Sequence, residues 1–479
     1  MMDVIQRNCP LCASRNTEYE FQVNNRRLRR CFDCELLFAT PFPESSDDAL
    51  GYTPAERFSD APTLIGALPP AQLLEWLQGH SKGSLHRIVV AGSGASGLTQ
   101  MACTQGIEVL KLKTDDPKPL EETGEIDACI LMGVLGEKSH PAAQLAHVHS
   151  FLKPGGVLLL TLPTVDGLRA RRQKAYRSAF RAPRAAYFDT HSLSALLVRC
   201  GFCDIRSWSR DNGAVVVCRK AKQRSEEKLP RLSIVLPVYN EQATCKELID
   251  TVLAKNIEGA EREIVIVESN STDGSREIVR AYEGHPDVRI IYEGQPRGKG
   301  YAVRNGIAHA TGDVLLIQDA DLEYDIEDYD SLLEPLFSQR RLFVLGSRHK
   351  GNWKMREFED RRWLGAVFNF GQIFFTWLIN VTCNTHLMDP FTMYKVFHRE
   401  CLYGLELEAN RFDLDWEIVI KFVRKGLIPL EIPVNYVSRS FSEGKKVRPL
   451  HDPILWFRAL VKFRYGPLYE SAVREGRTR

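Results

Sequence analysis

The C-terminal half of the chain alternates buried strand patterns with helix-forming segments, and this alternation is the strongest constraint on its fold. From residue 231 we expect strands in "RLSIVLPVYNE", "REIVIVESNSTDGS", "DVRIIYE" and "DVLLI", with helices between them. Strands that alternate with helices predict a parallel sheet of the α/β class. In such sheets, ligands bind at the carboxyl ends of the strands. Three strand ends bring polar side chains to that edge, namely Asn240, Glu241, Glu268, Asp319 and Asp321.

Four carboxylates follow the strand in "GDVLLIQDADLEYD", at positions 319, 321, 323 and 325. Hard oxygen ligands in this number suit Mg²⁺ or Mn²⁺, which would relieve their mutual repulsion. An EF-hand fits poorly, because Tyr324 stands where that loop needs glycine and a strand precedes it. A solvated acidic loop is the simpler alternative. We expect Asp321 and, directly or through water, Asp319 to face the metal, Glu323 to complete its shell, and Asp325 to cap the next helix.

Residues 70–220 show the same alternation and predict a second Rossmann-like sheet. In "HRIVVAGSGASG", Gly92, Gly94 and Gly97 stand between a strand and a helix in a GxGxxG layout. Such a turn lets the backbone approach a cofactor closely, although the pattern alone has low specificity. Cys200 and Cys203 form a CxxC with no partner pair nearby, and we expect them to pack in the core.

Two cysteine pairs near the N-terminus have the spacing of a metal site. Cys9 and Cys12 form one CxxC, Cys31 and Cys34 form another, and eighteen residues separate the pairs. Four thiolates on two such turns can surround Zn²⁺ as a tetrahedron. Because all four ligands come from protein, the zinc would be structural, and so small a unit would need it to fold. Four unrelated cysteines are the alternative.

These patterns divide the 479 residues into a zinc ribbon (1–41), a linker (42–69), a Rossmann-like domain (70–220), a second linker (221–230) and a C-terminal domain (231–479). The formal net charge of +2 gives no electrostatic footprint for nucleic acid. The N-terminus lacks the layout of a signal peptide, and the twelve cysteines are read as reduced thiols or metal ligands. We therefore expect a cytoplasmic protein.

Ordered motifs run through the C-terminal domain: "SIVLPVYNE", "NSTDGS", "RGKGYAVRNG", "GDVLLIQDADLEYD", "LGSR" and "MDPFTMYKVF". With them, residues 231–465 resemble family-2 glycosyltransferases of the GT-A fold, in the branch of dolichyl-phosphate-mannose synthase and other polyprenyl-phosphate glycosyltransferases. The resemblance implies a metal on a nucleotide-sugar diphosphate and a polyprenyl phosphate or glycan acceptor. Ser269 replaces the second of two adjacent aspartates of the family. The donor-binding positions implied are Pro237, Tyr239, Glu241, Glu268, Lys299, Asp319, Arg439 and Lys445.

If the acceptor is a hydroxyl group, catalysis also requires a general base. A phosphate acceptor is already anionic and needs none. The resemblance makes Asp389 the first candidate, with Asp415 and Glu417 as alternatives. Asp389 also precedes Pro390 and could instead cap a helix. A basic segment, "RSFSEGKKVR", could close over the diphosphate or be a solvated charge run. Its cations are Arg439, Lys445, Lys446 and Arg448.

The N-terminal part, "FLKPGGVLLLTLPT" and "LVRCGF" in particular, resembles class I S-adenosylmethionine-dependent methyltransferases, some of which carry a preceding zinc ribbon. The resemblance covers residues 1–220 and implies S-adenosylmethionine binding at Gly92, Gly94 and Gly97. The chain departs from the family at Val90, where an acidic residue is usual. Asp115 is the nearest candidate for the acid that holds the ribose. A working methyltransferase and a non-catalytic one are equal alternatives.

The most apolar stretch is 361–382, "RRWLGAVFNFGQIFFTWLINVT". On a helix, Asn369, Gln372, Thr376 and Asn380 form one polar stripe. They interrupt the run of about 20 apolar residues that a membrane-spanning helix needs. An interfacial helix on the cytoplasmic face of the membrane explains the pattern, and so does a buried core or dimer helix.

Three hypotheses follow. The first is an inverting, metal-dependent glycosyltransferase of cell-surface polysaccharide or glycolipid synthesis. The second is a bifunctional protein that also methylates the same glycan. The third is that the methyltransferase-like part and the ribbon form a non-catalytic assembly scaffold.

Overall fold

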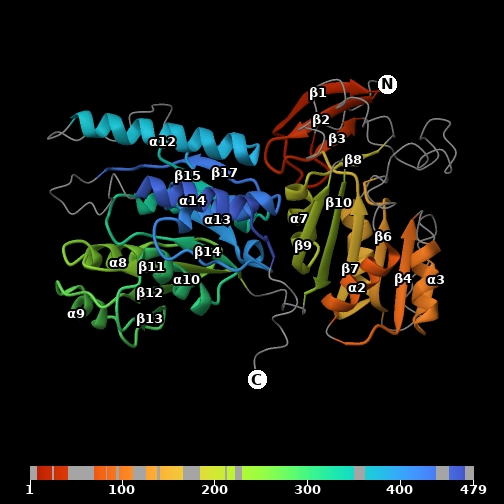
Figure 1. Ribbon diagram of the computed structural model, residues 1–479, viewed down its shortest axis with the longest axis horizontal. Coiled ribbons are helices and arrows are strands. Elements are labelled where there is room, and N and C mark those ends of the chain that lie inside the picture. Colours follow the sequence, from red (N-terminus) through yellow and green to blue (C-terminus); the bar gives the residue numbers. More distant parts are fainter. Residues whose placement is uncertain are drawn as a thin grey trace. The chain divides into compact units, whose positions relative to one another are not determined.

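The computed structural model describes residues 8–23, 26–40, 69–81, 83–92, 96–111, 126–136, 141–165, 184–210, 213–221, 229–349, 362–438 and 452–469. The chain divides into two compact units, residues 1–226 and 227–479, and each is described by itself (Figure 1).

The N-terminal unit contains two sheets. A small antiparallel sheet has the order β1-β2-β3-β8, with bounds Thr17–Val23, Arg26–Cys31, Leu37–Thr40 and Ala186–Tyr187. The larger sheet has the order β5-β4-β6-β7-β10-β9, with bounds Glu108–Lys111, Arg87–Gly92, Ile126–Met132, Leu152–Leu162, Gly213–Lys220 and Phe202–Arg210. Its first four strands are parallel, and β10 runs antiparallel to both β7 and β9. The alternation in the sequence therefore does produce a mostly parallel sheet.

Four described helices accompany these sheets: α2 (Pro70–His80), α3 (Ser96–Thr104), α4 (Pro141–Phe151) and α7 (Thr190–Arg199). A capping box begins α7, because Asp189 accepts from the backbone of Ser192 and Ser192 reaches back. The cysteine-bearing segment has no separate core: Leu36 and Phe38 belong to the same buried cluster as Leu158 of β7. Strand β3 also pairs with β8, and the shared buried cluster gives the ribbon and the larger sheet one interior.

The C-terminal unit is built on one seven-stranded sheet in the order β13-β12-β11-β14-β16-β15-β17. Strands β13 (Val288–Tyr292), β12 (Glu261–Glu268), β11 (Arg231–Val238) and β14 (Val314–Ile317) are parallel. Next come β16 (Lys395–His398), antiparallel to its neighbours, then β15 (Phe343–Ser347) and β17 (Leu430–Pro433). The four residues of β14 are all buried, as expected for a central strand covered on both faces.

Helices α8 (Cys245–Ala254), α9 (Ser275–Arg280), α10 (Lys299–His309), α11 (Tyr329–Phe337) and α13 (Leu414–Arg424) connect these strands. Two 3₁₀ turns are η2 (Ile326–Asp328) and η3 (Arg399–Leu402). Two further helices are α12 (Arg362–Cys383) and α14 (Asp452–Tyr465), and Figure 1 shows α12 running along one side of this unit. Gly306 lets α10 approach β11, because a Cβ there would lie 2.5 Å from Val235.

Candidate functional site

Three strands of the C-terminal unit end in left-handed backbone turns at the same edge of the sheet. Asn240 follows β11 (φ 52°), Asn270 follows β12 (φ 56°) and Leu322 follows β14 (φ 59°). Asparagine tolerates this conformation, but leucine seldom adopts it, and strain of this kind concentrates at functional sites. Leu322 stands between Asp321 and Glu323, so the strained residue lies within the acidic turn itself.

Lys299 is the cation that pairs with the first acid after β14. It is the first residue of α10, and its Nζ lies 2.6 Å from Oδ1 of Asp319 and 2.8 Å from Oδ2. Burial alone would lower the pKa of Lys299, but the carboxylates of Asp319 and Asp415 hold it above its ordinary value. The lysine therefore stays protonated at neutral pH. A Cβ on Gly300 would lie 2.6 Å from the carbonyl oxygen of Arg411, so this glycine is required where α10 packs on that loop.

Asp321 and Glu323 point to different partners. The backbone N–H of Glu323 donates to Oδ1 of Asp321 at 3.2 Å, while the Glu323 carboxylate accepts from the hydroxyl of Tyr436 at 2.9 Å. Within the described residues, the oxygens of Asp319, Asp321 and Glu323 do not all lie within 4.8 Å of one another. The structure thus does not bring the expected three-carboxylate shell together. Mg²⁺ usually takes one or two carboxylates plus substrate phosphates, and Asp319 and Asp321 fit that smaller donor set.

Asp325 lies outside this chemistry. Its side chain accepts from the backbone N–H of Glu327 at 3.0 Å and caps the η2 turn that leads into α11. The prediction that this acid caps the next helix is confirmed.

Glu268, the acid at the end of β12, is hydrogen-bonded within the turn that follows the strand. The buried carboxylate of Glu268 accepts from the backbone of Asn270 (3.2 Å) and Ser271 (2.7 Å) and lies 3.3 Å from a guanidinium nitrogen of Arg276. Ser269 donates to Glu293 at 2.8 Å. Glu293 is buried just after β13, and it supplies an acid beside the position where Ser269 replaces the family's aspartate.

The remaining expected donor positions are at the end of β11. Pro237 is half-buried within the strand, Tyr239 is exposed beyond it, and Glu241 donates its backbone N–H to the hydroxyl of Ser275 at 2.9 Å. Arg439, Lys445, Lys446 and Arg448 lie outside the described residues. The same holds for Gly94 and Asp115 of the N-terminal unit.

Asp389 is fully buried in an ion pair. Arg348 holds it with two side-chain hydrogen bonds of 2.8 Å and one backbone bond of 3.0 Å, and Gln372 of α12 donates at 3.1 Å. Burial alone would raise the pKa of Asp389, but the Arg348 guanidinium holds it below its ordinary value. No helix begins at Pro390, so the capping alternative is wrong. A carboxylate so enclosed and so weakly basic is poorly suited to accept a proton.

The two alternative bases also differ in their surroundings. Asp415 retains 14% exposure, and its Oδ1 lies 2.9 Å from Nζ of the fully buried Lys395. Because Asp415 raises the pKa of Lys299, it belongs to the same electrostatic cluster as Asp319. Glu417 is instead fully buried. It accepts from the backbone of Glu408 and Ala409 and from Lys421 at 2.6 Å, and so anchors the loop that precedes α13.

The four N-terminal cysteines converge as expected. Their sulfur atoms all lie within 4.8 Å of one another, with Cys9 and Cys34 at 3.5 Å and Cys12 and Cys31 also at 3.5 Å. A zinc tetrahedron with bonds of about 2.3 Å has S···S edges of about 3.8 Å, so the donor set fits Zn²⁺. The residues after Cys12 and Cys34 both have positive φ, at 58° and 61°, so the two turns repeat one geometry.

The glycine loop of the N-terminal unit has a packing explanation. A Cβ on Gly92 (φ 103°) would overlap the carbonyl oxygen of Met132 in β6, and one on Gly97 would lie 3.1 Å from Pro70. Both glycines are thus accounted for without a ligand, and S-adenosylmethionine binding stays a prediction. Cys200 packs against the unit's core as expected, and burial raises the pKa of its thiol to about 11.

The sequence did not indicate that Arg348 and Gln372 hold Asp389, that Lys395 pairs with Asp415, or that Glu293 accepts from Ser269. In each case the partner lies elsewhere in the chain. The one local signal was Lys395, a lone cation inside the apolar run "MYKVF".

The topology and strand-end acids of the C-terminal unit define a GT-A glycosyltransferase fold. In agreement, residues 233–403 match the family model Glycosyl transferase family 2, and residues 80–207 match the model Methyltransferase domain. The chain therefore contains a family-2 glycosyltransferase domain, preceded by a methyltransferase domain with a cysteine cluster at its N-terminal side.

Curated relatives match the C-terminal part. A dolichol-phosphate mannosyltransferase of Pyrococcus furiosus is 27% identical over 218 residues, which are 45% of this chain and 59% of that protein. A dolichyl-phosphate beta-glucosyltransferase of Trichomonas vaginalis is 27% identical over 249 residues, or 49% of this chain and 72% of the relative. A human protein of the same name is 27% identical over 239 residues, covering 46% and 70%. The match thus spans 59% of the first relative's length, which is less than two thirds.

Among solved structures, glucosyl-3-phosphoglycerate synthase from Mycobacterium tuberculosis, in complex with Mn²⁺, UDP-glucose and phosphoglyceric acid, is similar at 20% identity. The match has a TM-score of 0.37 and covers 50% of this chain and 81% of that one. So distant a likeness carries no weight here, and the fold assignment rests on the strand order and the family models.

Proposed function

We propose that this chain is an inverting, metal-dependent glycosyltransferase that moves a sugar from a nucleotide-diphosphate sugar to a polyprenyl phosphate. The observation that carries the proposal is the cluster of Lys299, Asp319 and Asp321 at the carboxyl end of β14. A family-2 domain and relatives named for transfer to dolichyl phosphate support the acceptor class. A glycan acceptor in cell-surface polysaccharide or glycolipid synthesis is the variant that the same site allows.

The residues of the edge divide the work. Asp319 and Asp321 would hold Mg²⁺ or Mn²⁺ together with the donor diphosphate, and that ion, when bound, supplies Lewis-acid stabilisation of the leaving group. Lys299 offsets the charge of Asp319 and offers a second cation beside the diphosphate. Strain at Leu322 fixes the turn in advance, so little reorganisation accompanies donor binding.

For a hydroxyl acceptor, Asp415 is a better base than Asp389. It keeps some exposure, whereas Asp389 is enclosed and has a depressed pKa. For a phosphate acceptor no base is needed, and Lys395 then has a second use. By neutralising Asp415 it lets an anion approach the donor sugar without meeting an unpaired carboxylate.

The outward face of α12 supports contact with a lipid surface. Phe370 (71% exposed), Trp377 (56%) and Val381 (60%) lie on one side of the helix together with Ile373 and Phe374. The polar stripe points inward instead: Gln372 reaches Asp389, and Asn380 donates to the carbonyl of Leu387 at 2.8 Å. An apolar outer face with a polar inner one is the reverse of an ordinary surface helix.

A neighbouring helix extends this face. On α14, Phe457, Val461 and Tyr465 are also exposed, at four-residue spacing. Phe375 of α12 packs on Trp416 of α13 (ring centroids 5.4 Å apart) and on Trp456 of α14 (5.3 Å), which joins the three helices. None of the described helices is both long enough and apolar enough to cross a membrane. We infer that the face rests on the membrane surface where a polyprenyl phosphate resides.

Two measurements test these proposals. In a panel of nucleotide sugars with Mn²⁺ or Mg²⁺, one member should raise the unfolding temperature of the protein and be consumed when polyprenyl phosphate is added. A panel with no such member would overturn the donor assignment.

The second measurement concerns the exposed apolar face of α12. The pair Phe370→Ser and Trp377→Ser should abolish binding to anionic vesicles. The matched pair Tyr19→Ser and Phe32→Ser, exposed aromatics of the N-terminal unit, should not. A dimer that the first pair dissociates, without any vesicle binding, would instead assign the face to a second copy.

A further inference from the structure

The acidic turn after β14, residues 319–325, is joined to the segment of chain that follows β17. The backbone N–H of Val437 donates to the carbonyl oxygen of Glu323 at 2.8 Å, and Tyr324 and Tyr436 form an antiparallel bridge. Backbone pairing of this kind holds two segments in one register. It brings the side chain of Tyr436 to the turn that carries the expected metal ligands.

Tyr436 is itself held on more than one side. Its hydroxyl donates to Oε2 of Glu323 at 2.9 Å, and its ring centroid lies 5.1 Å from that of Tyr324. The guanidinium carbon of Arg348 lies 5.3 Å from the same centroid, within the range of a cation–π contact. Because the ring is packed between a tyrosine and an arginine, its hydroxyl has a defined direction. That direction determines where the Glu323 carboxylate lies.

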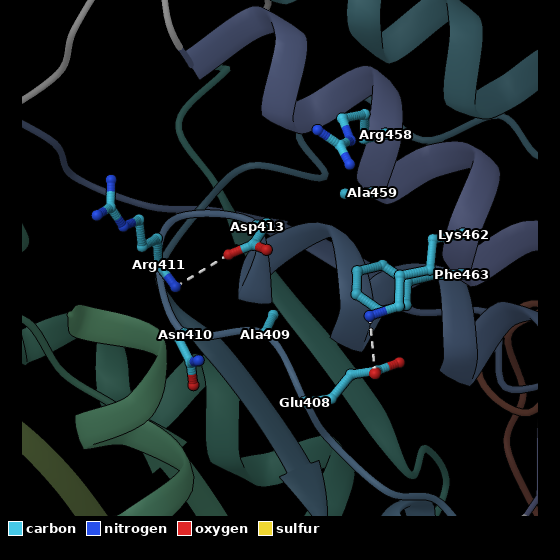
Figure 2. A pocket seen from close by; sticks show the side chains of 9 residues that line it. All are labelled: Glu408, Ala409, Asn410, Arg411, Asp413, Arg458, Ala459, Lys462 and Phe463. Carbon is cyan, nitrogen blue, oxygen red and sulfur yellow. Dashed lines mark hydrogen bonds and ion pairs between the residues drawn. The ribbon is translucent and has the colours of Figure 1, made fainter. Parts of the chain in front are cut away.

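The hydroxyl of Tyr436 differs from the cations that hold other acids of this unit. Figure 2 shows such an ion pair, in which Lys462 donates to Glu408 at 2.7 Å. Removing that lysine would change the local charge as well as the position of the acid. A phenol is a neutral donor, so Tyr436 orients Glu323 without contributing a charge. Replacing Tyr436 by Phe therefore changes where Glu323 can lie and leaves the formal charge of the site as it was.

We propose that Tyr436 is a positioning residue that keeps Glu323 out of the metal shell, so that Asp319 and Asp321 leave coordination positions open to the donor diphosphate. Among the described residues, the carboxylates of these three acids do not converge as metal ligands. An octahedral ion that binds a diphosphate takes one or two carboxylates, with phosphate oxygens and water in the remaining positions. A third carboxylate would compete with the donor for one of them. This inference rests on the metal site of the proposed function.

Titration of Mn²⁺ into the full-length protein without donor tests the inference, with the paramagnetic resonance signal of free Mn²⁺ as the readout. Tyr436→Phe should bind Mn²⁺ about tenfold more tightly than the wild type, because the released Glu323 adds a third carboxylate. Glu323→Gln alone should leave the affinity nearly unchanged. The double variant Tyr436→Phe/Glu323→Gln should return to the wild-type affinity. Glu323→Gln thus tests the same point without altering the ring.

A second titration follows inorganic pyrophosphate at saturating Mn²⁺. If Glu323 enters the shell once the hydroxyl is removed, Tyr436→Phe should bind pyrophosphate about tenfold more weakly than the wild type. Adding Glu323→Gln to Tyr436→Phe should restore the affinity. A merely structural loss at Tyr436 would not be reversed by a second substitution at Glu323, and it would lower the unfolding temperature without ligand, which we expect to stay unchanged.

The matched control is Tyr282→Phe, which removes a hydroxyl that donates to the exposed Asp250 at 2.6 Å in the same unit and should change neither titration. Unchanged or weaker Mn²⁺ binding in Tyr436→Phe overturns the inference. So does a loss of about tenfold or more in Glu323→Gln, since Glu323 would then be a ligand.

Asp321→Ala separates this failure from a failure of the proposed function. Mn²⁺ binding retained in Asp321→Ala, or absent from the wild type, would contradict the metal site and the inference with it. If Asp321→Ala loses Mn²⁺ while Tyr436 and Glu323 show no coupling, only the role of Tyr436 is rejected.

Discussion

Lys299 and Asp319 form an ion pair at the carboxyl end of β14, with the lysine Nζ 2.6 Å from one carboxylate oxygen and 2.8 Å from the other. The pair ties the start of α10 to the turn that carries Asp321. It also places a cation where a donor diphosphate would be held. We therefore expect donor binding to depend on this lysine as well as on the acids.

Replacing Lys299 by Met should raise the KM for the nucleotide sugar by about tenfold or more, whereas Lys299→Arg should keep most of the affinity. Because the pKa of Lys299 is raised, its charge and the ion pair persist below its ordinary pKa and are lost only as the pH rises through the higher folded value. Between about pH 6 and pH 9, deprotonation of this lysine should therefore cause no rise or fall in the initial rate. A rate change that depends on Lys299 in this range, or an unchanged KM in Lys299→Met, would contradict its role in donor binding.

The choice between Asp415 and Asp389 as a base can be made with hydroxyl acceptors. Asp415→Asn should lower kcat by about 100-fold or more. Lys395→Met should also lower kcat, because Asp415 would lose the cation whose Nζ lies 2.9 Å from its Oδ1 and holds it in place. Lys395→Arg should restore part of the activity. If Asp415→Asn is fully active while a folded Asp389→Asn protein is not, the assignment is reversed.

The buried pair of Asp389 and Arg348 should matter for stability. Asp389→Asn leaves a buried guanidinium uncompensated and should cost about 3 kcal/mol or more of unfolding free energy. Because the pKa of Asp389 is depressed, this contribution is present above the ordinary aspartate pKa of about 4 and is lost as the pH falls through the lower folded value. Denaturant unfolding at several pH values should show a constant difference from about pH 5 to 8 that shrinks below about pH 4. A difference that grows on acidification would contradict the pairing.

The cysteine cluster should couple metal to the stability of the whole N-terminal unit, since Leu36 and Phe38 share its core. Cys34→Ser should purify with less than the one zinc per chain expected of the wild type, measured by elemental analysis, and should unfold at lower temperature. Chelation of the wild-type protein should reproduce the loss. Cys103→Ser, at an exposed cysteine outside the cluster, is the matched control. Wild-type protein that holds no zinc would contradict the site.

The sequence predicted the elements well because their signals are local. The strand before Asp319, the cap at Asp325 and the two CxxC turns each depend on residues a few positions apart. The catalytic base was harder to predict from the sequence. Asp389 and Arg348 are 41 residues apart, and Glu417 is occupied by a loop whose path the sequence does not specify. Neither the sequence pattern nor the family resemblance shows that a carboxylate already pairs with another group of the protein and is thus a poor base.

The helix at 362–383 shows a different limit. The polar stripe through Gln372, Thr376 and Asn380 is visible in the sequence, and periodicity gives its spacing. Periodicity does not say which side faces inward. Since Gln372 reaches the buried Asp389, the stripe is directed to the interior and the apolar side is exposed. That orientation is set by tertiary contacts and could only come from the structure.

The central claim is that Asp321 holds the metal on a nucleotide-sugar donor. Titration of the donor into wild type and Asp321→Ala, each with Mn²⁺ or with excess chelator, tests it most directly, and sugar transfer to polyprenyl phosphate is followed in the same samples. We predict metal-dependent donor binding and transfer in the wild type and neither in Asp321→Ala, at an unchanged unfolding temperature without ligand. Metal-dependent transfer retained in Asp321→Ala would contradict the account.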